Sequence, residues 1–271
     1  MLFIGSLSKV NIHVADGLKS NQSYEGDHIV TKRAKKTRAF KTEEQNQVID
    51  FKKFRNRKQH VVLLPKNISQ ENYIDLLEDP TKDIVLAAGP AGTGKTMLAV
   101  LAALKAFKEG ECEKIVITRP AVCVDEQHGF LPGSLLEKMA PWVIPIMDVI
   151  EEYYSPKEIL SLVEEKIIEV APLAYMRGRT FKNSFIIADE TQSCTVNQMK
   201  MLLTRLGANS KIVLTGDLKQ HERGFEENGL KDFLELLKSK NSTRIGMIQF
   251  EQSDVERHPT VREVLSIYGD E

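Results

Sequence analysis

Cysteine is scarce in this chain of 271 residues, which has only Cys112, Cys123 and Cys194. An odd number of cysteines without paired metal-ligand spacing argues against a disulfide framework and is typical of a reducing compartment. Long apolar runs are also missing, so the sequence contains no segment able to cross a bilayer. The opening residues 1–5 lack the charged start and the long apolar region of a secretory signal. We therefore expect a cytoplasmic protein.

Net charge is also low, at -1, but the charge is unevenly distributed. The first 60 residues hold 13 Lys+Arg against 6 Asp+Glu, which leaves 24 against 32 for the rest. Two basic clusters, residues 32–38 and 52–58, account for most of this excess. Such clusters are usually solvated tails or linkers. They could also contact nucleic-acid phosphates, with Phe51 and Phe54 as stacking groups.

Residues 1–59 are therefore predicted to be a basic N-terminal extension, flexible in part, ahead of a domain at 60–271. In that domain apolar segments alternate with helical patterns. Strands are predicted at 84–88, 114–118, 167–171, 185–188, 211–215 and 247–250. Helices are predicted at 67–77, 97–104, 135–154, 156–165, 196–206, 229–238 and 260–268. This alternation indicates an α/β fold with three layers and a mostly parallel sheet, in which ligands bind at the carboxyl ends of the strands.

A glycine-rich turn lies between the first predicted strand and the next helix. It fits the phosphate-loop pattern G-x-x-x-x-G-K-[ST] with Gly89, Pro90, Ala91, Gly92, Thr93, Gly94, Lys95 and Thr96. Its backbone N–H groups and the helix N-terminus would enclose nucleotide phosphates. Lys95 would reach the β- and γ-phosphates, and Thr96 would put its hydroxyl on a bridging Mg²⁺. The sequence thus predicts a binding site for ATP and Mg²⁺.

Two carboxylates follow the apolar strand at 185–188. Asp189 can hold the magnesium beside Thr96, and Glu190 can orient or deprotonate the attacking water. The next strand, at 211–215, leads to Asp217 and Gln220. Gln220 could sense the γ-phosphate, whereas Asp217 could simply cap a turn. Together with the phosphate loop, Asp189 and Glu190 favour hydrolysis over nucleotide storage.

Several segments together resemble the PhoH family, a group of single-core ATPases related to superfamily 1 helicases. The resemblance covers roughly residues 60–268, and the segments at 129–133 and 171–180 are its most specific parts. Those that carry it are Gly89–Thr96, Ile117–Val122, Gly129–Gly133, Ala171–Thr180, Asp189–Gln192, Thr204–Gly207, Thr215–Asp217 and Arg257–Pro259. The family commonly has Asp-Glu-Ala-Gln-Asn where this chain has Asp-Glu-Thr-Gln-Ser at 189–193.

This resemblance implies an α/β three-layer P-loop core of the RecA or helicase kind. It implies an ATPase that assembles as a homo-oligomer, with a hexameric ring as the expected form, that remodels single-stranded RNA or DNA and is linked to phosphate starvation. Some relatives carry a nuclease ahead of the ATPase, but residues 1–59 are too short for one, so we predict no nuclease activity. We also expect no membrane association.

The resemblance also suggests roles for further residues. Gln70 and Tyr73 resemble a helicase Q motif, in which an amide reads adenine and a ring stacks on it; Gln70 could equally be a surface residue. Arg177, Arg179 and Arg257 are candidates for an arginine finger from a neighbouring subunit, with a slight preference for Arg257. Phosphate binding or a salt bridge stays open for the other two.

Two further residues have open roles. Arg119 lies where related helicases grip a nucleic-acid backbone, but it could pair with an acidic neighbour instead. Trp142 lies in an apolar, proline-containing segment that could form a subunit contact, guide a threaded strand, or be a core helix.

The alternative function is a nucleotide-gated scaffold protein with incidental ATP turnover. A small-molecule kinase lacks a recognisable acceptor pocket.

Overall fold

The computed structural model describes residues 52–55, 60–120, 135–219, 228–240 and 242–268. The expectations for residues 1–51 and 56–59, and for Gln220, lie outside these described residues. Helix α2 (Lys52–Arg55) belongs to the segment predicted as an extension. Its Phe54 is nevertheless buried in the core with Phe107, and Arg55 donates to the carbonyl of Cys112 at 3.0 Å. Phe54 is therefore a packing residue, which excludes it from the stacking role that the sequence left open.

Within the described residues, six parallel strands form one sheet in the order β3-β2-β4-β5-β1-β6. They are β1 (Ile84–Ala88), β2 (Lys114–Thr118), β3 (Ile168–Val170), β4 (Ser184–Ala188), β5 (Lys211–Gly216) and β6 (Ile245–Gln249). Every predicted strand is present, with ends displaced by at most two residues. All of the pairings between these strands are parallel, which confirms the predicted α/β sheet.

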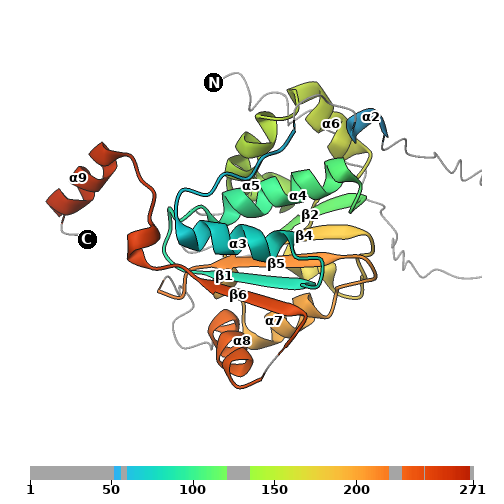
Figure 1. The fold of residues 1–271 in the computed structure, drawn as a ribbon. Coiled ribbons are helices and arrows are strands. Elements are labelled where there is room, and N and C mark those ends of the chain that lie inside the picture. Colours follow the sequence, from blue (N-terminus) through green and yellow to red (C-terminus); the bar gives the residue numbers. More distant parts are fainter. Residues whose placement is uncertain (1–51, 56–59, 121–134, 220–227, 241, 269–271) are drawn as a thin grey trace, which may run out of the picture. The chain divides into compact units, whose positions relative to one another are not determined.

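Helices cover both faces of the sheet, with α3, α4 and α5 on one face and α7 and α8 on the other (Figure 1). The helices are α3 (Ile68–Glu78), α4 (Lys95–Glu109), α5 (Leu135–Glu151), α6 (Pro156–Glu164), α7 (Val196–Leu203), α8 (Gly229–Lys238) and α9 (Pro259–Tyr268). Three single turns are η2 (Leu173–Met176), η3 (Thr191–Ser193) and η4 (Gln252–Asp254). Polar side chains cap the N-termini of three helices. Asn67, Thr195 and Asn228 each accept a hydrogen bond from a backbone N–H in the first turn of the helix that follows.

Alternate residues of each central strand enter two separate cores. Val85 and Ala87 of β1 pack with α3 and α4, whereas Leu86 and Ala88 pack with the elements on the α7 and α8 side. Because both faces are covered, the strands read as continuous apolar runs and not as alternating ones. The polar residues that follow the strands are left at one edge of the sheet.

Helix α5 is a core helix, one of the alternatives that the sequence left open for this segment. It continues through Pro145 to Glu151, and Val143, Ile146 and Ile150 are buried. Across the described ranges, no helix combines the length and apolarity that a bilayer crossing needs.

Candidate nucleotide site

The loop at residues 89–96 joins β1 to α4 in the geometry that the glycine spacing predicts. Gly89, Gly92 and Gly94 have positive φ values of 149°, 87° and 83°. A Cβ on Gly89 would lie 2.6 Å from both the Cβ and the carbonyl oxygen of Phe250, so no larger residue fits there without displacing backbone. Gly94 is the left-handed residue from which α4 begins. The loop conformation therefore depends on glycine.

Lys95 turns back over this loop. Its Nζ donates to the carbonyls of Gly89 at 2.7 Å and Pro90 at 2.6 Å, and to the Thr93 hydroxyl at 3.3 Å. Burial lowers the pKa of Lys95, and the nearby carboxylates of Asp217, Glu190 and Asp189 oppose this shift. The ammonium is thus a nearly enclosed cation at the mouth of the loop.

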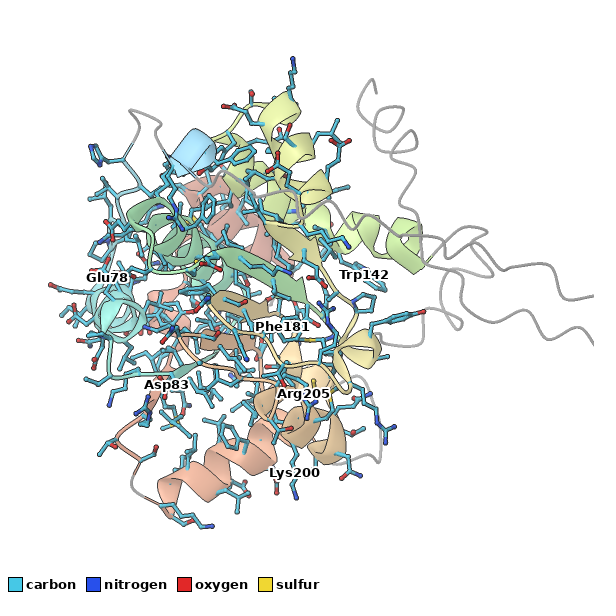
Figure 2. All side chains as sticks on the ribbon, turned by 90° about the vertical axis from the view of Figure 1, so that its right-hand side faces the viewer. Glu78, Asp83, Trp142, Phe181, Lys200 and Arg205 are labelled. Atoms are coloured by element: carbon cyan, nitrogen blue, oxygen red, sulfur yellow. The ribbon has the colours of Figure 1, made fainter. Side chains whose placement is uncertain are left out.

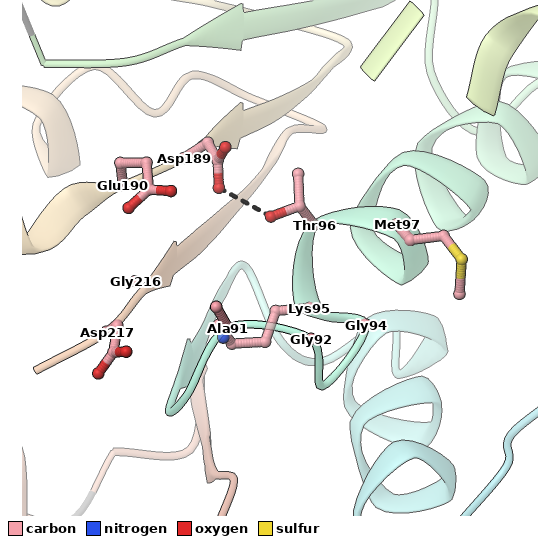
Figure 3. Close-up of a pocket in the computed structure, with 10 residues that line it drawn as sticks. All are labelled: Ala91, Gly92, Gly94, Lys95, Thr96, Met97, Asp189, Glu190, Gly216 and Asp217. Atoms are coloured by element: carbon pink, nitrogen blue, oxygen red, sulfur yellow. Dashed lines mark hydrogen bonds between the residues drawn. The ribbon is translucent and has the colours of Figure 1, made fainter. Parts of the chain in front are cut away.

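Asp189, at the end of β4, meets the first turn of α4. The Thr96 hydroxyl donates to Asp189 Oδ1 at 2.8 Å (Figure 3), and the hydroxyl of Thr215, in β5, donates to the same oxygen at 2.5 Å. A hydroxyl and a carboxylate side by side are the hard oxygen ligands that Mg²⁺ prefers, so Thr96 and Asp189 fit the predicted metal site.

Glu190 has a left-handed backbone, with φ of 53°, which is rare for a residue with a side chain. Gln192 Nε2 donates to Glu190 Oε2 at 2.5 Å, and Gln192 Oε1 accepts from the backbone N–H of Asp217 at 3.1 Å. Arg119 Nη2 lies 3.7 Å from the other carboxylate oxygen. The acidic-neighbour alternative for Arg119 is therefore present, and Gln192 is a site residue to which the sequence reasoning gave no role. Its place in the family motif at 189–192 was the available signal.

These groups surround a cavity of about 280 Å³ at the carboxyl edge of the sheet. Figure 3 shows the residues that line it: Ala91, Gly92, Gly94, Lys95, Thr96, Met97, Asp189, Glu190, Gly216 and Asp217. Asp217 also accepts from the N–H of Lys219 at 2.9 Å, so it caps a turn, as the second alternative for it predicted. The loop, the Lys95 ammonium, the candidate metal ligands and the candidate base thus line one cavity.

Gln70 and Tyr73 have positions that change their predicted roles. Gln70 is only 1% exposed; its Nε2 donates to the carbonyl of Thr93 at 3.1 Å, and its Oε1 accepts from the N–H of Lys66 at 2.9 Å. Tyr73 is 0% exposed and packs edge-on against Phe250. The stacking role predicted for Tyr73 is therefore wrong, because its ring is enclosed in the core. Gln70 is not a surface residue; it braces the phosphate loop.

Arg257 lies beside the phosphate loop of its own chain. Its Nη2 donates to the carbonyl of Ala91 at 3.5 Å, and the N–H of Glu256 donates to the carbonyl of Gly92 at 3.0 Å. Asn67, which caps α3, donates to the carbonyl of Asp254 at 3.2 Å. The segment after β6 therefore reaches the site within one chain, in contrast to the supply from a neighbour that we predicted for Arg257.

The other two arginine candidates point to different roles. Arg179 forms an ion pair with Glu169 at 2.5 Å, and its guanidinium lies 4.5 Å from the centre of the Phe181 ring. This contact supports the salt-bridge alternative for Arg179. Arg177 is exposed. The structure thus brings together at the loop Lys95, Thr96, Asp189, Glu190 and Arg257. Arg179 instead pairs with Glu169 of β3.

A strand, a glycine-rich loop and a helix that begins with Lys95 and Thr96, with an aspartate from a nearby strand on the threonine, define a P-loop nucleoside-triphosphatase fold. A sequence model of the PhoH-like protein family matches residues 62–269. The chain therefore belongs to the PhoH family.

Individual relatives agree with this assignment. A PhoH-like protein of Bacillus subtilis is 44% identical over 205 residues, which are 75% of this chain and 63% of that protein. A PhoH-like protein of Synechocystis is 41% identical over 208 residues, 76% of this chain and 62% of the relative. Protein PhoH of Escherichia coli K12 is 36% identical over 211 residues, which are 76% of this chain and 58% of that protein. This chain thus spans less than two thirds of the length of these relatives.

Among solved structures, the chain is similar to the Sulfolobus solfataricus SWI2/SNF2 ATPase core in complex with double-stranded DNA. The TM-score is 0.41 at 12% identity, and the match covers 74% of this chain and 49% of that one.

Proposed function

We propose that this chain binds ATP with Mg²⁺, hydrolyses the nucleotide, and uses the free energy of hydrolysis to remodel single-stranded RNA or DNA. The observation that carries the proposal is the single cavity shared by Lys95, Thr96, Asp189 and Glu190. An ammonium, a metal-binding pair and a carboxylate outside the metal pair are the set of groups that phosphoryl transfer to water requires.

Each residue has a defined task in this mechanism. Lys95 exchanges the carbonyls of Gly89 and Pro90 for oxygens of the β- and γ-phosphates. Thr96 and Asp189 would hold Mg²⁺, which would supply positive charge against the phosphate oxygens. Glu190 accepts a proton from the water that attacks the γ-phosphorus. As the new P–O bond forms, the bond from the γ-phosphorus to the bridging oxygen breaks, and ADP and inorganic phosphate leave.

Arg257 is well placed to assist in the same chain. Its guanidinium already lies at the carbonyl of Ala91, so a small side-chain movement would bring it to a bound phosphate. A guanidinium neutralises charge that develops on the transferred group.

The proposal includes a homo-oligomer, with a hexameric ring as the form that the family resemblance implies. Helix α9 supports self-association because it exposes apolar side chains at helical spacing. Val261 and Val264 are 44% exposed, and Ile267 and Tyr268 are 77% and 78% exposed. Arg177, which is exposed, is the remaining candidate for an arginine supplied to a neighbour's site.

The test compares wild-type protein with Glu190→Gln for ATP binding and for phosphate release. We expect wild type to release phosphate, with turnover that rises with protein concentration and with single-stranded RNA. Glu190→Gln should bind ATP with unchanged affinity and release no phosphate. A variant that turned over ATP like wild type would refute the role of Glu190. Normal biological activity in a variant without turnover would favour a nucleotide-gated scaffold.

A further inference from the structure

The side chain of Arg119 links the candidate base to the only tryptophan of the chain. Arg119 directly follows β2, and Glu190 follows β4 by two residues. These strands are neighbours in the sheet, with Thr118 opposite Ala188. The N–H of Asp189 donates to the carbonyl of Thr118 at 3.0 Å and extends this pairing to the strand ends. The sheet therefore fixes Arg119 next to Glu190.

Both carboxylate oxygens of Glu190 face a restraining group. Gln192 donates to Oε2 at 2.5 Å, and Arg119 Nη2 lies 3.7 Å from Oε1. A general base needs a carboxylate oxygen directed at the attacking water. While the guanidinium attracts Oε1, that oxygen is less free to turn toward an attacking water. Gln192 is neutral and also anchors to the backbone of Asp217, so it positions the glutamate without adding a competing charge.

Arg119 also contacts Trp142, and both side chains could bind a nucleic acid. Its guanidinium lies 5.6 Å from the centre of the Trp142 ring, and the Arg119 and Glu190 side chains are 29% and 34% exposed. An ion pair this long and this accessible to water is weak. A phosphodiester offers a bidentate, stronger partner for the same guanidinium, and a base can stack on the indole that the guanidinium then uncovers.

We propose that Arg119 restrains Glu190 when no nucleic acid is bound, and that the backbone of a single-stranded nucleic acid releases Glu190 by taking the guanidinium. This inference rests on the proposed ATP hydrolysis and adds its regulation. Arg119 acts as a positioning residue, because it works through Glu190.

The first test measures phosphate release with and without a single-stranded oligoribonucleotide. Arg119→Gln should raise basal turnover about two- to five-fold, the range expected for the loss of a weak, exposed ion pair. It should also abolish the rise on adding RNA. Arg119→Lys, which keeps the charge, should keep basal turnover near the wild-type value. Lys200→Gln is the matched control, because Lys200 is exposed on α7 and lies well apart from Trp142 (Figure 2). It should behave like wild type.

The second test uses Trp142 as a reporter, since its emission can be excited where tyrosine does not absorb. RNA should change this emission in wild type and also in Glu190→Gln, because the change in emission reports binding and does not depend on ATP turnover. Arg119→Gln should lose most of that response. Melting temperatures equal to that of wild type show that the variants are folded. A response to RNA that Arg119→Gln leaves unchanged would overturn the exchange of partners.

Other outcomes separate this inference from the proposed function. Lower basal turnover in Arg119→Gln, with the RNA stimulation retained, would mean that Arg119 assists Glu190, and would overturn the restraint while leaving the ATPase intact. Equal stimulation by heparin, a polyanion without bases, would overturn nucleic acid as the ligand. Wild-type protein that binds no ATP and releases no phosphate would instead refute the proposed function itself.

Discussion

Replacing Lys95 by methionine removes the ammonium and keeps a side chain of similar length. In the structure the ammonium donates to the Gly89 carbonyl, the Pro90 carbonyl and the Thr93 hydroxyl. With ATP bound, its donors would turn to phosphate oxygens. A hydrogen bond to a charged group is worth about 1.5–3 kcal/mol, which predicts a loss of ATP affinity of about 10- to 150-fold.

The same change should leave folding intact. Because burial lowers the pKa of Lys95, the folded protein favours the neutral form more than the unfolded chain does. The charge therefore disfavours folding at neutral pH, and this cost disappears as the pH rises through the lowered pKa toward the value of unfolded lysine. The methionine variant lacks this charge at every pH but also loses the three hydrogen bonds of the ammonium, so the two effects oppose each other and its melting temperature at neutral pH should stay within a few degrees of that of wild type.

Titration calorimetry with ATP and Mg²⁺ measures the affinity, and thermal denaturation measures the stability. Lys200→Met is the control, because Lys200 is exposed on α7. Equal ATP affinities for Lys95→Met and wild type would refute the assignment of this loop as the phosphate site. A drop in affinity together with a large drop in melting temperature would mean that the lysine supports the loop and not the ligand.

Three further predictions follow from the described contacts. Asp189→Asn should lower phosphate release roughly a hundred-fold or more at moderate Mg²⁺, since a metal ligand is lost; a Mg²⁺ dependence like that of wild type would contradict the metal site. Gly89→Ala should lower the free energy of unfolding by about 1–3 kcal/mol through its collision with Phe250, beyond the strain of its backbone. Gly178→Ala is its control: φ is 78°, but apart from its chain neighbours no atom of the described residues lies within 4 Å of the new Cβ, so only strain of about 1 kcal/mol is expected in denaturant melts. Burial raises the pKa of Cys112 to about 12, so at pH 8 roughly one thiol in ten thousand is ionised, and alkylation followed by peptide mass spectrometry should label Cys112 only after unfolding.

Much of the fold could be predicted because its signals are local. Apolar runs and helical spacing located every strand of the sheet to within two residues, and the pattern at 89–96 specified the loop. The errors involve residues whose partners are distant in sequence. Helical spacing placed Gln70 and Tyr73 on one face of α3 without showing that Phe250 and the loop backbone cover this face.

The arginines illustrate the same limit. Arg257 lies at its own loop because β6 pairs with β1, and the order of strands is not written in any local pattern. Arg179 is held by an ion pair with Glu169 of β3. This contact forms only because the fold brings the segment of Arg179 next to β3.

By itself, the sequence predicted the glycine-rich loop between a strand and a helix, because the glycines and the lysine of its pattern lie within eight consecutive residues. Only the tertiary structure decided which groups meet across the sheet. Thr96 and Asp189 are 93 positions apart, and Arg119 reaches Glu190 from another strand. The parallel sheet brings them together, since the carboxyl ends of all its strands lie at one edge and the strand order selects the neighbours.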